Sequence, residues 1–179
     1  MDDIELEPIG FVKQGVLVTQ DGVTDPLAQI EASASWSDWV PLDEALAVAP
    51  RLPGVYMARE MRHGQVIYVG MAGERRGSRD RPQGIRGRLS IYVRGKGMAS
   101  GLGEAALDRA LADPQFLQLR SDEVERGEPI RAKEWGREAL AWAALSIRWA
   151  TTADKASAVA LERQVIGLLA NSALWNRLR

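Results

Sequence analysis

The sequence predicts a mixed α/β protein of the α+β type, in which a small central antiparallel sheet is flanked by helices and interrupted by a helical insert. Residues 54–60 (GVYMARE) and 65–72 (QVIYVGMA) have strand character, and the polar turn 61–64 between them predicts a hairpin. Residues 145–152 (LSIRWATT) predict a third, buried strand. Because segments with helical periodicity follow the hairpin and this strand, the sheet has helices to pack against.

The residues before the hairpin are less clearly patterned. Residues 1–35 are predicted to form a loosely specified lead-in, with strand-like runs at 11–23 broken by a glycine and a turn signal. Residues 40–50 predict a short helix that begins near Pro41 and ends at Pro50. Residues 1–50 contain one basic and ten acidic residues, and we expect them to form an acidic extension that packs on a domain formed by residues 51–179.

A helix is predicted directly after the hairpin and a polar loop. Ile85, Leu89 and Tyr92 recur at helical spacing and would share its buried face. The predicted insert spans about residues 98–144. The elements predicted from the loop onwards are a polar loop at 73–84, the helix from 85, a glycine-rich break at 94–103, a short helix at 104–113, a strand at 114–124, a helix at 130–145, the buried strand, and a final helix at 154–170 capped by Thr151 or Thr152.

The composition excludes several classes of site. The chain has no cysteine, which rules out disulfides, thiolate nucleophiles and cysteine-ligated zinc. Its one histidine, His63, lies in the predicted hairpin turn, so we expect it to be exposed and not catalytic. A metal would be held by carboxylates, water and substrate oxygens, which favours Mg²⁺ or Mn²⁺. No apolar run has transmembrane length and the acidic N-terminus does not resemble a secretory signal, so we expect a cytoplasmic protein without membrane contacts.

Positive charge is concentrated in the middle of the chain. Residues 59–96 contain ten basic and three acidic residues, a distribution typical of a surface that contacts a polyanion such as DNA. The alternative is a solvated loop whose arginines pair with the acidic extension, and composition alone favours that alternative. The predicted contacts with nucleic acid are Arg75, Arg76, Arg79, Arg81, Arg86, Arg94 and Lys96.

Five short motifs occur in a recognisable order. Residues 54–56 read Gly-Val-Tyr and residues 68–70 read Tyr-Val-Gly, one on each strand of the predicted hairpin. Arg88 follows on the next helix in GIRGRLSIY, Glu162 lies on the last helix in LERQVI, and Asn176 follows in LWNRL. This order resembles that of the GIY-YIG nuclease family. The resemblance covers about residues 52–97 and 145–178, and leaves the acidic extension and the insert outside it.

The resemblance implies a metal-dependent endonuclease that hydrolyses phosphodiester bonds in DNA. Arg88 would clamp the phosphate through its planar, permanently charged guanidinium, and Glu162 would hold a single divalent metal. Tyr56 would take part in activating the attacking water, while Tyr68 would position water or phosphate. Cutting both strands with one site per chain often requires two copies, which is compatible with a homodimer. The residues expected to support the site are Tyr92, Asn176 and Gly70.

Two other functions remain open at this stage. Many members of the family have a basic residue directly after the second motif, and this chain has Met71 there. This difference supports a nucleic-acid-binding module of the same fold that does not cut. A protein-interaction domain is the other alternative, with the acidic extension and the six tryptophans as its surface.

Overall fold

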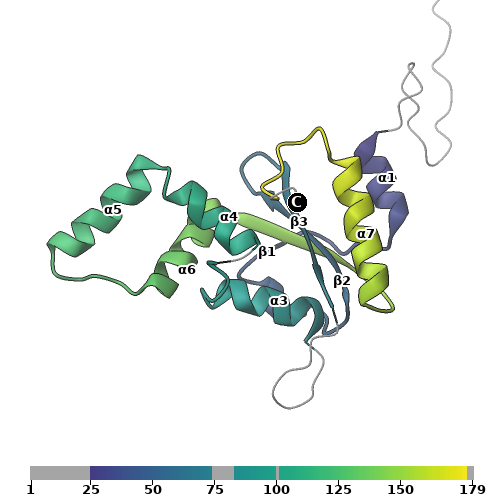
Figure 1. Ribbon diagram of the computed structural model, residues 1–179, viewed down its shortest axis with the longest axis horizontal. Coiled ribbons are helices and arrows are strands. Elements are labelled where there is room, and N and C mark those ends of the chain that lie inside the picture. The colour runs from purple at the N-terminus through teal and green to yellow at the C-terminus, as the bar shows by residue number, and fades with distance from the viewer. Residues whose placement is uncertain (1–24, 74–82, 100, 177–179) are drawn as a thin grey trace, which may run out of the picture.

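The computed structural model describes residues 25–73, 83–99 and 101–176 of the chain. Its centre is a four-stranded antiparallel sheet in the order β1-β4-β2-β3 (Figure 1). The predicted fold class is confirmed, since the protein is an α+β fold with a central antiparallel sheet flanked by helices. The strands are β1 (Val40–Pro41), β2 (Gly54–Glu60), β3 (Val66–Ala72) and β4 (Leu145–Thr151).

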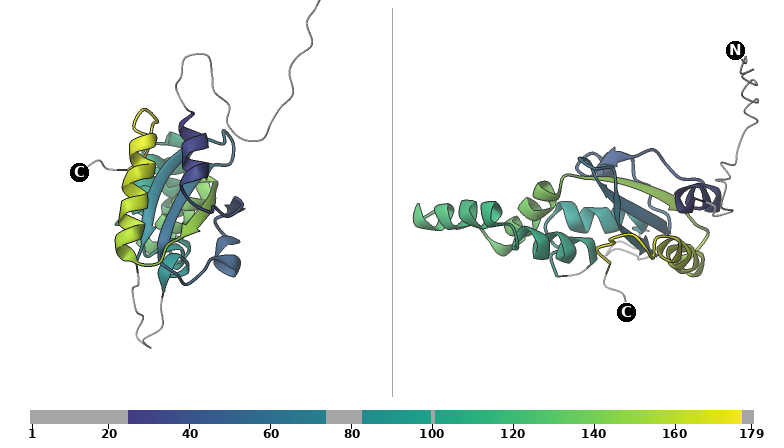
Figure 2. Two further views of the ribbon diagram at one scale, coloured as in Figure 1. Left: turned by 90° about the vertical axis from the view of Figure 1, so that its right-hand side faces the viewer. Right: turned by 90° about the horizontal axis from the view of Figure 1, so that it is seen from above.

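Helices cover both faces of the sheet. Helices α1 and α7 pack on one face, while α2, α3, α4 and α6 contribute to the core on the other. Helix α5 lies away from the sheet, at the far end of the helical insert (Figures 1 and 2). None of the helices in the described ranges has both the length and the apolar character needed to cross a bilayer. The helices are α1 (Pro26–Ser33), α2 (Ala45–Val48), α3 (Gly84–Val93), α4 (Gly101–Ala110), α5 (Pro114–Glu125), α6 (Ala132–Ala143) and α7 (Lys155–Leu168).

The predicted hairpin is formed by β2 and β3, and its register brings the two motif tyrosines to one face. Side chains alternate along a strand, so Val55 faces the core under α7 while Tyr56 faces the core under α3. Tyr56 is opposite Gly70 on β3, and Tyr68 is opposite Ala58, two residues along β2 from Tyr56. Tyr56, Ala58 and Tyr68 therefore share the α3 side.

The N-terminal part of the described chain differs from the sequence-based prediction. Residues 26–33 are helical, because Asp25 caps the helix through the Leu27 N–H and Pro26 occupies its first turn. Ile30 of this helix is completely buried against α7 and the sheet. The predicted helix at 40–50 is reduced to α2, since residues 40–41 pair with β4 as strand β1. The predicted strand-like runs at 11–23 lie outside the described residues.

The insert is helical, as predicted, but one of its elements was assigned wrongly. Residues 114–125 form helix α5 and not a strand, because the Asp113 carboxylate accepts from two backbone N–H groups and Pro114 begins the helix. Helix α4 starts earlier than predicted, at Gly101, inside the glycine-rich stretch. The last helix is capped by Asp154 and not by a threonine, since the Asp154 carboxylate accepts from the Ser157 N–H.

Candidate active site

Three tyrosines from three elements form one cluster under helix α3. The hydroxyls of Tyr56 on β2 and Tyr92 on α3 are 2.8 Å apart and share a hydrogen bond. The rings of Tyr56 and Tyr68 are stacked with centroids 6.2 Å apart, and Tyr92 lies at the same distance from Tyr56 in a tilted orientation. Tyr56 and Tyr92 are each 1% exposed, whereas Tyr68 is only partly buried. Tyr68 is therefore the member of the cluster that solvent can reach.

The glycine of the second motif makes this packing fit. A Cβ at Gly70 would lie 2.5 Å from the Tyr56 hydroxyl oxygen and 2.6 Å from its Cζ. Any side chain at this position would therefore displace the buried ring of Tyr56. This contact gives Gly70, expected to support the site, a steric role.

The insert also contacts the cluster, which the sequence did not predict. Gly101 has φ +58°, and a Cβ there would lie 2.9 Å from the Tyr92 hydroxyl and 3.0 Å from the Tyr68 hydroxyl. Helix α4 thus begins directly against two of the three hydroxyls. The signal for this contact in the sequence is the pair Gly101 and Gly103 ahead of an apolar helix, and the predicted glycine-rich break at 94–103 does not include it.

The outer edge of β3 holds two of the predicted site residues in place. Asn176 pairs with Val69 through its side chain, accepting from the Val69 N–H at 3.0 Å and donating to its carbonyl oxygen at 2.7 Å. Two residues further along the strand, the Met71 N–H donates to the Glu162 carboxylate. The side chain of Asn176 therefore makes the hydrogen bonds that a neighbouring strand would make, and Glu162 is bound two residues further along the same edge.

Glu162 is half-buried on α7 and interacts with the charged and phenolic groups around it. Burial raises its pKa, while the Met71 N–H and the positive charges of Arg88 and Arg163 act in the opposite direction. The negative charge of Glu162 in turn helps to raise the pKa of Tyr68. Residues from α3, β3 and α7 therefore share one electrostatic environment.

Both motif tyrosines are neutral at pH 7. Burial is the main cause that raises the pKa of Tyr56 well above its usual value, with contributions from Tyr92 and Tyr68. The pKa of Tyr68 is also raised, first by burial and then by Tyr92 and Glu162, and Arg88 lowers it only in part. The two hydroxyls are consequently hydrogen-bond donors and acceptors, and neither is a ready phenolate.

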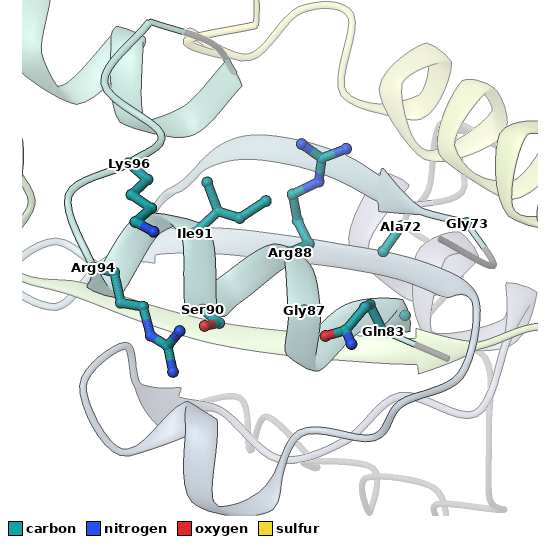
Figure 3. Close-up of a pocket in the computed structure, with 10 residues that line it drawn as sticks. Ala72, Gly73, Gln83, Gly87, Arg88, Ser90, Ile91, Arg94 and Lys96 are labelled. Atoms are coloured by element: carbon teal, nitrogen blue, oxygen red, sulfur yellow. The ribbon is translucent and has the colours of Figure 1, made fainter. Parts of the chain in front are cut away.

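Arg88 projects from α3 into a pocket of about 240 Å³ that Arg94 and Lys96 also line. In Figure 3 the Arg88 and Arg94 side chains extend from opposite sides of the helix, and the Arg88 side chain extends toward β3. Arg86 lines a different pocket with Arg51, so the two arginines of GIRGR point to different surfaces. Arg94 and Lys96 are exposed. The other predicted contacts, Arg75, Arg76, Arg79 and Arg81, lie outside the described residues.

Two residues singled out in the sequence have clear structural positions. The Met71 side chain packs against the apolar cluster under α7, and only its backbone takes part in the site through Glu162. Methionine in place of a basic residue at position 71 therefore does not affect the hydrogen bond from the backbone N–H to Glu162. His63 is exposed in the hairpin turn, where its Nδ1 lies 3.0 Å from the Glu60 carboxylate.

A metal at this site would have one protein carboxylate. Within the described ranges no group of three or more histidine, cysteine, aspartate or glutamate residues could hold a metal ion. Glu162 fits a hard cation that keeps most of its water, since carboxylate, water and phosphate oxygens are the ligands that Mg²⁺ and Mn²⁺ prefer. The neighbouring Tyr68 hydroxyl is also an oxygen donor.

Comparison of the chain with protein-family models, curated proteins and solved structures gives no match.

Proposed function

We propose that this protein is a metal-dependent endonuclease of the GIY-YIG type that hydrolyses phosphodiester bonds in DNA. The observation that supports the proposal best is the proximity of Arg88, Tyr68 and Glu162, which come from α3, β3 and α7. Arg88 and Glu162 act in opposite directions on the pKa of Tyr68, and Arg88 also acts on the pKa of Glu162. Metal-dependent hydrolysis of a phosphodiester needs a cation, a group that orients water and a metal ligand close together. Arg88, Tyr68 and Glu162 are side chains of these three types.

Arg88 binds the scissile phosphate in this proposal. Its guanidinium donates two parallel hydrogen bonds to phosphate oxygens and offsets the charge that develops on them during attack. The carboxylate of Glu162 holds the divalent metal, which when bound supplies a Lewis acid for the phosphoryl oxygens and the leaving alkoxide.

The role proposed for Tyr56 differs from the one that the resemblance implies, whereas the role of Tyr68 stays the same. Tyr56 is buried and its hydroxyl is bonded to Tyr92, so it acts by holding the cluster in place. Tyr68 is accessible and lies beside Glu162, so it orients the attacking water. Water attacks phosphorus as the P–O bond to the leaving strand breaks. Because Tyr68 is protonated at pH 7 and cannot act as a base, the proton lost by the water passes to solvent, and the leaving alkoxide takes up a proton from solvent.

A cleavage assay with supercoiled plasmid and branched DNA tests the proposal. We expect the wild-type protein to cut in Mg²⁺ or Mn²⁺ and not in EDTA. Glu162→Gln and Arg88→Ala should each lower the rate by a factor of about 100 or more, the order of magnitude found when one group that stabilises a transition state is removed. Glu128→Gln is the matched control, because Glu128 is an exposed glutamate that pairs with Arg126 in the insert.

The same preparations separate the alternatives. Equal nicking by wild type and Glu162→Gln would mean a contaminating activity, and the enzyme proposal would be lost. DNA binding that weakens steeply with salt, without cleavage, would instead support a binding module. If DNA binding is absent or insensitive to salt, neither nucleic-acid function holds and an interaction with protein becomes the explanation.

A further inference from the structure

A second pocket adjoins the candidate active site on the side of the insert. It has a volume of about 390 Å³ and lies between helix α4 and the segment at 174–176, with Tyr68 in its wall. Small-molecule sites commonly have volumes of about 300–1,000 Å³, so this pocket is large enough for one ring system and a sugar. Since Tyr68 belongs to both the pocket and the tyrosine cluster, a ligand in the pocket lies next to the site proposed for the phosphate.

One side of the pocket is a planar stack. The Arg109 guanidinium lies over the Trp175 ring, 4.4 Å from its centroid, and Arg109 also donates to the Ala105 carbonyl oxygen at 3.0 Å. Burial lowers the pKa of this arginine, although Asp108 and Glu60 oppose the effect. A guanidinium held flat in this way is a surface on which an aromatic base can stack.

Helix α4, which forms one wall of the pocket, carries two carboxylates. Glu104 and Asp108 are one turn apart on α4, and both line the pocket. Their negative charge disfavours a phosphate in the pocket. Their oxygens accept hydrogen bonds, which suits the amino group on the edge of a nucleobase.

The start of α4 fixes this wall relative to the tyrosines. Because Gly101 packs against the Tyr68 and Tyr92 hydroxyls, the helix that carries both carboxylates cannot shift independently of the cluster. On the other side Trp175 donates its backbone N–H to the Ile67 carbonyl oxygen at the edge of β3. Both sides of the pocket are thus attached to the elements that position Tyr68.

We infer that this pocket binds a single unstacked nucleobase of the DNA strand, next to the phosphate at the candidate active site, and that it favours a base with an exocyclic amino group. The base stacks on Arg109 and donates its amino hydrogens to Glu104 or Asp108. The inference rests on the proposed function, because the phosphate beside Tyr68 brings the neighbouring base to the pocket. It gives the insert a role in selecting the strand or base next to the cut.

Binding of two homopolymeric octamers to the full-length protein in EDTA tests this inference without any cleavage. Single-stranded deoxycytidine and deoxyuridine octamers differ at C4, where the amino group of cytosine is replaced by a carbonyl oxygen, and at N3, which carries a hydrogen only in uracil. We expect the deoxycytidine octamer to bind about tenfold more tightly by fluorescence anisotropy at pH 7.5, the order of magnitude of one good base-edge contact. Because every position has the same base, the register of the strand does not affect the result.

Two sets of variants locate the effect. Glu104→Ala/Asp108→Ala should remove the preference for cytosine, whereas Asp122→Ala/Glu125→Ala, an equivalent pair on α5, should keep it. If circular dichroism shows that the first double variant does not fold, Arg109→Lys tests the inference instead, since lysine retains the charge but lacks the planar surface. It should weaken binding of both octamers by about tenfold, as expected for loss of one stacked base.

Several results would overturn the inference. These are equal affinity of the wild type for the two octamers, a preference that survives Glu104→Ala/Asp108→Ala, and binding of free deoxycytidine monophosphate as tight as that of the octamer. If plasmid cleavage occurs without any base preference, this inference fails and the proposed hydrolysis stands. If the protein shows the base preference but does not cleave DNA, this inference stands and the proposed hydrolysis fails.

Discussion

Replacement of Gly70 by alanine should destabilise the protein, although Gly→Ala in a strand is normally favourable. A Cβ at Gly70 would lie 2.5 Å from the Tyr56 hydroxyl oxygen, roughly 0.9 Å inside the 3.4 Å at which ordinary contact begins. Tyr56 cannot yield easily, because its ring is buried and its hydroxyl is bonded to Tyr92. Overpacking of this kind costs about 1–3 kcal/mol, against a gain of about 0.5–1 kcal/mol from backbone entropy.

A contact below 3.0 Å belongs in the upper half of the overpacking range, about 2–3 kcal/mol. The expected net loss is therefore about 1–2.5 kcal/mol of unfolding free energy, or a Tm lower by about 2–10 °C for a chain of this size. Urea and thermal denaturation measure it. Gly167→Ala is the matched control, since its Cβ would meet nothing within 4 Å on helix α7, and it should be neutral or stabilising. Tyr56→Phe should cost less in the Gly70→Ala background than in the wild type, because it removes the closest atom of the clash. A Gly70→Ala protein as stable as the wild type would refute the packing described for the tyrosine cluster.

Three further predictions concern the same site. Tyr92→Phe leaves the buried Tyr56 hydroxyl without its partner and should cost about 1–3 kcal/mol in urea denaturation, whereas an unchanged midpoint would contradict the hydrogen bond. Glu162→Gln should be more stable than the wild type at pH 7. The pKa of Glu162 is raised in the folded protein, so the wild type loses stability as the pH rises through this pKa, whereas glutamine does not titrate. The difference in Tm between the two proteins should disappear below about pH 4, and a Tm difference independent of pH would count against this. Asn176→Ala should accelerate deuterium exchange at the Val69 amide while the amides of β2 keep their protection, and equal Val69 exchange in both proteins would rule out the edge pairing.

Much of the framework could be predicted from local pattern. Two short apolar runs separated by a polar turn identified β2 and β3, and helical spacing identified α3 and α7. Local chemistry also carried signals that we interpreted wrongly. Asp113 followed by Pro114 is a strong helix start, and the strand predicted at 114–124 is wrong because it leaves this signal out of account. At residues 40–41 the local sequence predicts a helix, and these residues form a strand because they pair with β4.

By itself the sequence determined which chemical groups this protein carries and the order of the elements that hold them, because these follow from residue type and from local periodicity. The tertiary structure decided which tyrosine is accessible, since Tyr56 and Tyr68 have similar local sequence but only Tyr56 is fully buried. It also decided that the Met71 backbone contacts Glu162 and that the insert closes against Tyr68 through Gly101. These contacts join residues far apart in the chain, and their geometry depends on strand register and helix packing, which no local pattern specifies.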